Sequence, residues 1–390
     1  MKNIITMLFL LLLPITVLIS CDSTKETPPT IEDLVDSIVE IESGRDIRIL
    51  QLTDTQIIDA SQSRSEDRLD ANSKIKWATN TIEANCFNYI RDTIEMTNPD
   101  LILITGDVVY GEFDDTGTTF RKVVKYMDSF KIPWAIVFGN HDNESKMGVD
   151  WQCELLENAE YSLFKRGNVT GNSNYTIGIV QDGELKRVIY MMDTNGCANS
   201  DDPSVKNALS FAKDQLEWFD ESANKIEEFV GDKVNSFVCF HVPVEEFGIA
   251  AVNAGYQKEV YEENTYTIGS KRTPAQNGDF GVKGELYKAM HPVPGLFELF
   301  KKHAVDGVFV GHSHLNSTSV LYEGIRWTFG LKTGTYDRYS ANQLGGTYIE
   351  VHSDNSFTVE HKYVKHYKIE PDTYSHIYMG LIEKVNAKWK

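Results

Sequence analysis

The chain is poor in cysteine and in basic side chains. Its 390 residues include 5 Cys, and 38 Lys and Arg stand against 57 Asp and Glu, giving a formal net charge of −19 at pH 7. Binding to a nucleic-acid backbone requires clustered Lys and Arg, so we expect no nucleic-acid partner. A small anionic substrate is not excluded, because bound metal ions can reverse the sign of the charge at a site.

The few cysteines show no metal-binding pattern. Cys86, Cys153, Cys197 and Cys239 lack C-x-x-C spacing, and most of them lie inside apolar stretches. Buried free thiols are the simpler interpretation. One disulfide in an exported protein is the alternative, and the sequence does not say which two residues would form it.

Long hydrophobic runs are also absent, except for residues 4–19, which follow a basic start at Lys2. This run is shorter than the ~20 apolar residues that usually span a bilayer, and it contains Pro14. It therefore predicts a signal segment over residues 1–21 rather than a transmembrane anchor. The residues Leu18-Ile19-Ser20-Cys21 resemble a bacterial lipobox, which implies lipid attachment at Cys21 and a membrane-anchored lipoprotein in the cell envelope, facing the periplasm or the outer surface.

The rest of the chain divides into two parts by composition. Residues 22–45 are polar and acidic and predict a flexible tether. Residues 46–390 predict a single domain with a C-terminal extension. With 41% hydrophobic residues, 19 Phe and 18 Tyr in the whole chain, this part can form a large core.

Five short apolar stretches predict buried strands, at residues 47–52, 101–104, 134–138, 237–240 and 307–310. Helical periodicity lies between them, at residues 82–94, 120–127, 209–229 and 294–303. The alternation predicts a layered α/β fold. In such folds the loops at the carboxyl ends of the strands converge and form sites.

A polar motif follows each predicted strand. The motifs are Asp54-Thr55-Gln56, Gly106-Asp107-Val108-Val109-Tyr110, Gly139-Asn140-His141-Asp142, His241 and Gly311-His312-Ser313-His314. Together they supply carboxylate, amide, phenol and imidazole groups, a donor set that suits transition-metal ions. A lone His beside an apolar strand is more often structural than a ligand. The His-x-His spacing and the other motifs in order favour ligands here.

The order of these motifs resembles the calcineurin-like metallophosphoesterase superfamily. The G-D-x-x-Y spacing is closest to small single-domain proteins similar to the purple acid phosphatases. The resemblance implies a four-layer α/β/β/α sandwich, with two mixed sheets packed face to face and helices outside.

The resemblance also implies two metal ions, Fe, Mn or Zn. Asp107 would bridge them; the first ion would take Asp54 and His314, and the second Asn140, His241 and His312. Tyr110 is a further ligand in the purple acid phosphatases, although a partly buried aromatic at a strand end is an equal alternative. The superfamily usually has His where this chain has Gln56, and an amide is a poorer ligand, so that contact is expected to be weak or absent.

The activity implied by the resemblance is hydrolysis of phosphomonoesters or phosphodiesters by a hydroxide held by the dinuclear metal centre. His141 would face the scissile phosphate and protonate the leaving oxygen, and Asp142 would orient its ring. The partner would be a phosphorylated small molecule or ester. A nucleotidase is disfavoured, because too little chain remains for a second domain.

A second hypothesis is an inactive phosphoesterase-fold lipoprotein that acts as a binding protein. The motifs argue against it, because only Gln56 departs from the expected ligands. Outside the motifs, the long connection between His241 and Gly311 is either a recognition loop or a solvated excursion. Three further residues are candidate substrate contacts, with a structural role as the alternative: Lys332, Tyr336 and Arg338.

Overall fold

The computed structural model describes residues 29–58, 81–196, 209–256, 278–287, 289–335 and 339–365. Several predictions fall outside these ranges: the signal segment with Cys21, Cys197, residues 257–277 of the long connection, Tyr336, Arg338 and the end of the chain from residue 366. Among the described helices, none combines the length and the apolar character that crossing a bilayer requires.

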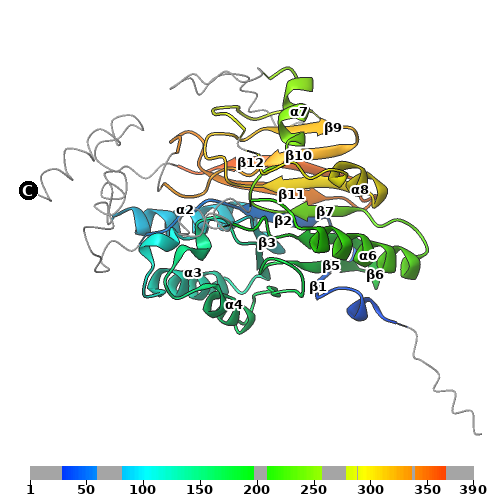
Figure 1. The fold of residues 1–390 in the computed structure, drawn as a ribbon, viewed down its shortest axis with the longest axis horizontal. Helices are drawn as coiled ribbons and strands as arrows, with labels where there is room; N and C mark the ends of the chain where they lie inside the picture. The colour runs from blue at the N-terminus through cyan, green and yellow to red at the C-terminus, as the bar shows by residue number, and fades with distance from the viewer. Residues whose placement is uncertain are drawn as a thin grey trace, which may run out of the picture.

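Two mixed β-sheets form the centre of the fold (Figure 1). One has seven strands, in the spatial order β1 (Ser37–Ile41), β5 (Tyr175–Gln181), β6 (Glu184–Met191), β7 (Ser236–Cys239), β8 (Val305–Val310), β10 (Ile325–Phe329) and β9 (Ser319–Tyr322). The other has five, in the order β12 (Phe357–Tyr363), β11 (Gly345–Val351), β2 (Ile47–Leu52), β3 (Leu101–Ile104) and β4 (Trp134–Ile136). In both sheets the strands that precede the polar motifs run parallel to one another.

Helices cover the outer faces of the two sheets. The first group is α2 (Thr81–Thr97), α3 (Thr118–Ser129) and α4 (Val149–Glu157); the second is α6 (Lys213–Val230), α7 (Glu246–Asn253) and α8 (Leu296–Lys302). Single 3-10 turns occur at Ile31–Asp33, Gly111–Phe113 and Asp142–Glu144. The predicted four-layer sandwich is therefore confirmed, and the predicted strands and helices all recur with shifts of a few residues at their ends.

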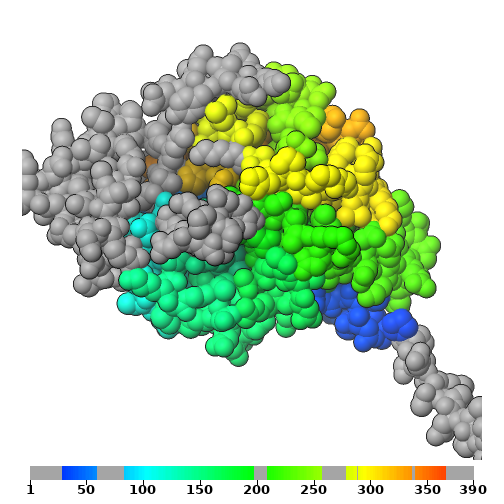
Figure 2. Space-filling view, viewed as in Figure 1, coloured from blue at the N-terminus to red at the C-terminus, as the bar shows by residue number. Residues whose placement is uncertain are grey.

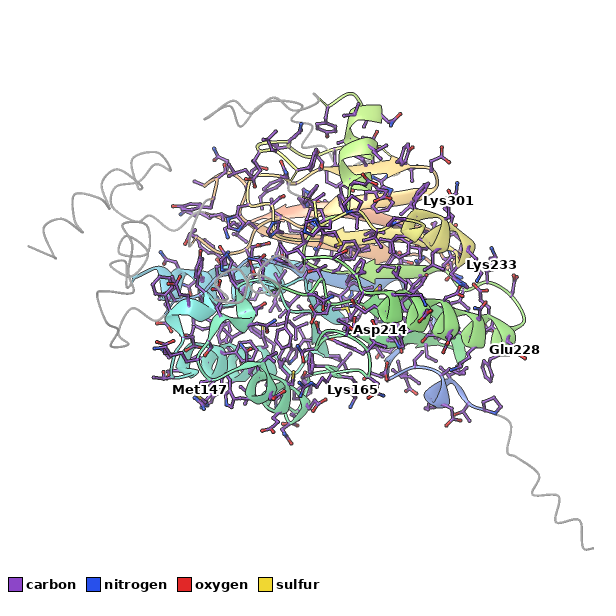
Figure 3. The ribbon with its side chains drawn as sticks, in the orientation of Figure 1. Met147, Lys165, Asp214, Glu228, Lys233 and Lys301 are labelled. Carbon is purple, nitrogen blue, oxygen red and sulfur yellow. The ribbon has the colours of Figure 1, made fainter. Side chains whose placement is uncertain are left out.

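Side-chain alternation along β7 explains the layering. Phe237 and Cys239 belong to the core that lies between the sheets and extends beneath α2 and α3, whereas Val238 belongs to the core beneath α6 and α8. Successive side chains of a strand point to opposite faces, so a wholly apolar strand is buried on both. In Figure 3 the labelled charged side chains Lys165, Glu228 and Lys233 lie at the edge of the molecule.

Contacts between His303 and two carboxylates join the end of α8 to α6. His303, at the end of α8, is buried between Asp220 and Glu227 of α6, with ring nitrogens 2.6 and 3.0 Å from their carboxylate oxygens. The rings of Phe219 and Phe300 meet edge to face below this contact. In Figure 2 the yellow surface around α8 accordingly adjoins the green surface of α6.

The structure bears on two further sequence predictions, the flexible tether and the buried free thiols. The tether predicted for residues 22–45 is wrong for β1, because Ser37–Ile41 pair in parallel with β5 and close one edge of the larger sheet. The strand is short and partly polar, so its pairing with residues about 140 positions away is not visible locally. The prediction of buried free thiols is confirmed for Cys153 and Cys239. Cys86 is also buried, and its thiol contacts the carbonyl oxygen of Thr55.

Candidate metal centre

Two clusters of potential ligands meet at the carboxyl ends of the parallel strands. Asp54, Asp107 and His314 form one, and Asp107, His241 and His312 form the other; within each, the ligand atoms lie within 4.8 Å of one another. Asp107 belongs to both. The shared carboxylate is the position predicted for the bridge between two ions.

The two clusters draw on both sheets. Asp54 and Asp107 follow β2 and β3 of the five-stranded sheet, whereas His241, His312 and His314 follow β7 and β8 of the seven-stranded sheet. Across this junction, His241 Nε2 lies 3.2 Å from Asp107 Oδ2, and His314 Nε2 lies 3.4 Å from Asp54 Oδ1. The site therefore exists only where the two sheets pack together.

Asn140 completes the second cluster. Its Oδ1 lies 2.9 Å from Nδ1 of His312, and it is buried at the end of the segment that follows β4. An amide oxygen, two imidazoles and a carboxylate are thus within reach of one ion. The structure brings together all the residues predicted as ligands of the second ion.

Buried atoms without hydrogen bonds show that the donor set fits metal ions. Asp54 Oδ1 and His241 Nε2 are buried and lie 3.4 and 3.2 Å from His314 Nε2 and Asp107 Oδ2, yet neither atom forms a hydrogen bond among the described residues. An unsatisfied buried polar atom costs roughly 1–3 kcal/mol. A cation bound between these atoms would remove that cost, and both belong to the two clusters.

Remaining atoms of the ligands are held by neighbours that fix their orientation. Nδ1 of His241 contacts the carbonyl oxygen of Thr105 at 2.7 Å, which leaves Nε2 toward Asp107. The second oxygen of Asp54 accepts hydrogen bonds from Thr53 Oγ1 at 2.7 Å and from the backbone N–H of His312 at 3.0 Å. Such contacts orient metal ligands in many proteins.

The backbone at the ligands is strained. Asp54, Asp107 and His312 have φ values of 52°, 52° and 67°, in the left-handed region that non-glycine residues seldom occupy. Strain of this kind collects at functional sites, where the surrounding structure holds it in place. The turns after the strands thereby aim the side chains back across the edge of the sheets.

Two motifs need glycine because a carboxylate of another motif lies close against the glycine backbone. A Cβ on Gly139 would lie 2.2 Å from Asp107 Oδ1, and a Cβ on Gly311 would lie 2.6 Å from Asp54 Oδ2. Both distances are far below van der Waals contact. The Gly of G-N-H-D and the Gly of G-H-S-H therefore make space for the carboxylates of other motifs.

Electrostatics at the centre favour ionised carboxylates. Burial would raise the pKa of Asp107, but the imidazoles of His241 and His141 outweigh burial and lower it. Burial would lower the pKa of His241, but the charge of Asp107 outweighs burial and raises it to about 9. The pKa of His312 is lowered to about 3 by burial and by the neighbouring His241. The proton on His241 thus occupies a place that a cation would take, and metal binding would release it.

His141 lies beside the clusters. Its ring stacks on Tyr110, with ring centroids 4.2 Å apart, and its backbone N–H donates to Asp107 Oδ1 at 2.9 Å. Its Nδ1 contacts Oε1 of Glu144 at 2.8 Å. Tyr110 is thereby placed at the site as predicted, and its role as a ligand stays a prediction.

The role predicted for Asp142 is wrong. Its carboxylate accepts hydrogen bonds from the backbone N–H groups of Asp107, Val108, Val109 and Gly139, at 2.7–3.2 Å. Asp142 thus joins the loops that carry Asp107 and Asn140, and Glu144 takes the contact with the His141 ring. The cause is the 3-10 turn Asp142–Glu144, which turns the third residue after His141 back toward it.

The side chains of Gln56 and Lys332 contact each other beside Asp107. Gln56 Nε2 donates to Asp107 Oδ2 at 3.2 Å, and its Oε1 accepts from Lys332 Nζ at 3.0 Å. Lys332 is only 2% exposed and also donates to the carbonyl oxygen of Asp54 at 2.7 Å. These contacts favour the structural alternative, and the role of Lys332 as a substrate contact stays a prediction.

One more polar residue at the carboxyl ends of the strands was not predicted from the sequence. Asp193 follows β6, and its carboxylate accepts hydrogen bonds from the backbone N–H groups of Asn172 and Asn195 at 2.7 and 2.8 Å. The apolar run before Asp193 has the same form as those before the five motifs, and that run was the available signal. Asp193 organises the loops beside His241.

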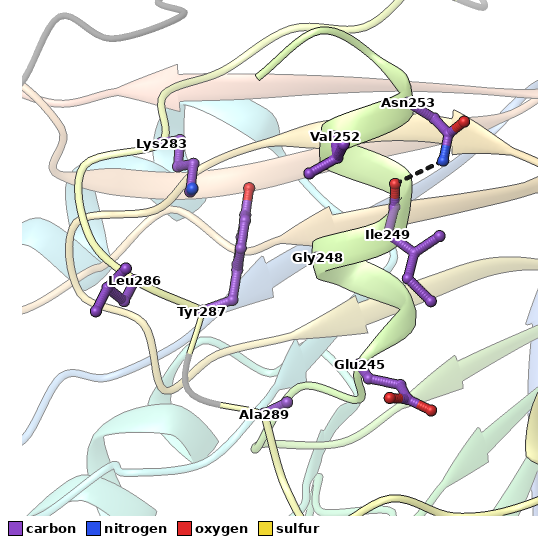
Figure 4. Close-up of a pocket in the computed structure, with 9 residues that line it drawn as sticks. All are labelled: Glu245, Gly248, Ile249, Val252, Asn253, Lys283, Leu286, Tyr287 and Ala289. Carbon is purple, nitrogen blue, oxygen red and sulfur yellow. Dashed lines mark hydrogen bonds between the residues drawn. The ribbon is translucent and has the colours of Figure 1, made fainter. Parts of the chain in front are cut away.

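The described part of the long connection includes a pocket of about 650 Å³ between α7 and residues 283–287 (Figure 4). Ile249 and Val252 of α7 line one side, and Leu286 and Tyr287 line the other. The loop is tied to the segment after His314, because the backbone N–H of Gly284 donates to Asn316 Oδ1 at 3.0 Å. No residue of the two clusters lines the pocket, which is therefore separate from the metal centre.

Several known proteins are similar in sequence to this chain. Phosphatase DCR2 of Saccharomyces cerevisiae is 27% identical over 247 residues, which are 58% of this chain and 38% of that protein. Probable inactive purple acid phosphatase 28 of Arabidopsis thaliana is 33% identical over 305 residues, 73% of this chain and 69% of the relative. A probable glycerophosphodiester phosphodiesterase, GpdQ, of Arcobacter nitrofigilis is 25% identical over 184 residues, 45% of this chain and 55% of the relative.

The chain spans less than half the length of the yeast phosphatase. The family model described as calcineurin-like phosphoesterase matches residues 47–316, which is more than half of the chain and includes all five motifs. The chain belongs to the calcineurin-like phosphoesterase family.

Proposed function

We propose that this protein is a metal-dependent hydrolase of phosphomonoesters or phosphodiesters. The observation that carries the proposal is the single buried carboxylate of Asp107 shared by two ligand clusters. A pair of ions bridged in this way neutralises phosphate oxygens and generates a nucleophile from water at neutral pH. Asp54, Asp107 and His314 would hold one ion, and Asp107, Asn140, His241 and His312 the other.

The chain's own residues supply the remaining requirements. His141 is 15% exposed at its side chain and lies next to Asp107, so it can reach a phosphate ester bound at the centre. Glu144 holds Nδ1 of the ring. A proton donated from Nε2 to the leaving oxygen would assist bond cleavage.

The test is the rate of nitrophenol release from matched aryl phosphate monoesters and diesters. We expect turnover with added Mn²⁺, Zn²⁺ or Fe, and its loss with chelator. Asp107→Asn should abolish turnover, whereas Glu154→Gln, on the exposed side of α4, serves as the matched control. Failure of the folded protein to turn over either ester with any of these metals would refute the proposal.

A second candidate is a binding protein with the phosphoesterase fold but without activity. The name of the Arabidopsis thaliana relative, a probable inactive purple acid phosphatase, favours considering it. The two candidates separate by measurement: a binding protein would take up metal and phosphate without hydrolysing either ester. The intact ligand set favours the enzyme.

We also propose that the mature protein is held at the cell envelope by a lipid on Cys21, with the polar segment that follows it linking the lipid to the domain. The support is the lipobox-like segment before Cys21. Labelling of bacteria that express the protein with an alkyne-modified fatty acid should mark the wild-type chain and not Cys21→Ser. Equal labelling of both would contradict the anchor.

A further inference from the structure

The two halves of the metal centre are unequal. The cluster around His241 and His312 has a fourth donor in Asn140, whose oxygen is 2.9 Å from His312 Nδ1. At the cluster around Asp54 and His314, Gln56 stands where the family usually has a His ligand, and its side chain contacts Asp107 Oδ2. Whether the two metal positions are equivalent therefore depends on whether the Gln56 side chain presents its amide oxygen to an ion.

The amide of Gln56 has both ends occupied. Its NH₂ group donates to Asp107 Oδ2 at 3.2 Å, and its oxygen accepts from Lys332 Nζ at 3.0 Å. A flipped amide would place its oxygen against the carboxylate and its NH₂ against the ammonium, which are two repulsive contacts. The oxygen is thus turned to Lys332 and is withheld from an ion.

Lys332 is held firmly at this place. Its ammonium also donates to the carbonyl oxygen of Asp54 at 2.7 Å, and the side chain is buried. The following residue, Thr333, donates its backbone N–H to the carbonyl oxygen of Thr53 at 2.9 Å. A Cβ on Gly334 would lie 2.0 Å from the carbonyl oxygen of Thr55, so the two segments are in close contact.

A buried ammonium one amide group away from Asp107 repels a cation at the nearer cluster. Charges interact more strongly in the interior of a protein than in water, because the effective dielectric constant there is lower. Lys332 contacts the backbone of Asp54, which belongs to the first cluster and not to the second. Lys332 therefore acts on the two positions unequally.

We propose that Gln56 and Lys332 make the centre asymmetric, so that the position at Asp107, Asn140, His241 and His312 binds its ion at least tenfold more tightly than the position at Asp54, Asp107 and His314. The inference rests on the proposed metal-dependent function. It adds that Gln56 is a hydrogen-bond donor to the shared carboxylate rather than a ligand. The weaker position then fills only when the metal concentration is high.

The test is a titration of the metal-free full chain with Mn²⁺, followed by calorimetry and by electron paramagnetic resonance. We expect two binding steps at least tenfold apart, with spin coupling between ions appearing only in the second. Lys332→Met and Gln56→His should each tighten the second step about tenfold and leave the first within threefold. Lys301→Met, which removes a surface ammonium, is the matched control and should change neither step.

Two steps of equal affinity in the wild type would overturn the proposal, as would a second step that neither Lys332→Met nor Gln56→His changes. Circular dichroism verifies folding, and if Lys332→Met does not fold, Gln56→His and the wild-type titration decide. The outcome is independent of turnover. A symmetric centre in an active enzyme refutes only this inference, whereas an asymmetric centre without hydrolysis refutes only the proposed function.

Discussion

Among the individual residues of the site, Glu144 has the clearest testable role. It is 2.8 Å from Nδ1 of His141 and its side chain is almost fully buried. Burial raises the pKa of Glu144, and the contact with His141 opposes that rise. A carboxylate in this place orients the ring and favours the protonated imidazole that proton donation requires.

We therefore expect His141→Ala to lower turnover about 10²- to 10⁴-fold and Glu144→Gln to lower it about tenfold or more. The loss should be larger for an alkyl phosphate than for a nitrophenyl phosphate, because a poor leaving group depends more on the proton. Both variants should keep near-normal metal content by elemental analysis. Loss of bound metal in His141→Ala would instead make His141 a ligand.

Residue types at the centre were predictable from the sequence, because the motifs are short and each follows an apolar strand. The hydrogen-bond partners of these residues were less predictable. Asp142 was expected beside His141, yet its carboxylate binds four backbone N–H groups. The 3-10 turn that exchanges the roles of Asp142 and Glu144 depends on local backbone angles that residue types alone do not specify.

At the scale of secondary-structure elements, Asp100 joins the start of β3 to the start of β2. Its carboxylate oxygens lie 2.8 Å from Arg45 Nη1 and 3.0 Å from Arg48 Nη2, and accept the backbone N–H of Arg48 at 2.9 Å. Burial would raise the pKa of Asp100, but hydrogen bonds from Arg45 and Arg48 outweigh it and lower the pKa. The ionised form therefore stabilises the fold.

Asp100→Asn should lower the free energy of unfolding by about 1–3 kcal/mol at pH 7. Because the pKa in the folded state is depressed, this contribution is complete above the unfolded value of about 3.9 and is lost as the pH falls through the folded value. Urea unfolding should thus show a constant difference from pH 7 to about pH 5 and a shrinking one below about pH 4. A difference that already shrinks between pH 7 and pH 5 would contradict this assignment.

On the scale of the whole molecule, the metal centre is a junction between the sheets. Ligands from the five-stranded sheet face ligands from the seven-stranded sheet. Ions bound there should stabilise the folded chain, since the unfolded chain holds no such site. At a free metal concentration of 100 times Kd, the stabilisation is about 2.7 kcal/mol.

We accordingly expect added Zn²⁺ to raise the melting temperature of the full chain and chelator to reverse the change. Asp107→Asn, which removes the shared carboxylate, should abolish most of the shift measured by scanning calorimetry. Asp232→Asn, at an exposed position after α6, is the control and should retain the shift. An equal shift in Asp107→Asn would show that Zn²⁺ stabilises the protein elsewhere.

The alternation of strands and helices and the set of candidate ligands could be predicted from the sequence, and the four-layer fold from the family that the motifs resemble. Local periodicity and motifs that immediately follow strands can both be read along the chain. The tertiary structure alone decided the pairing of β1 with β5, the contact of Glu144 with His141 and the contact of Lys332 with Gln56. Gln56 and Lys332 are 276 positions apart. Their contact arises because buried polar groups must find partners wherever the packed sheets bring them together.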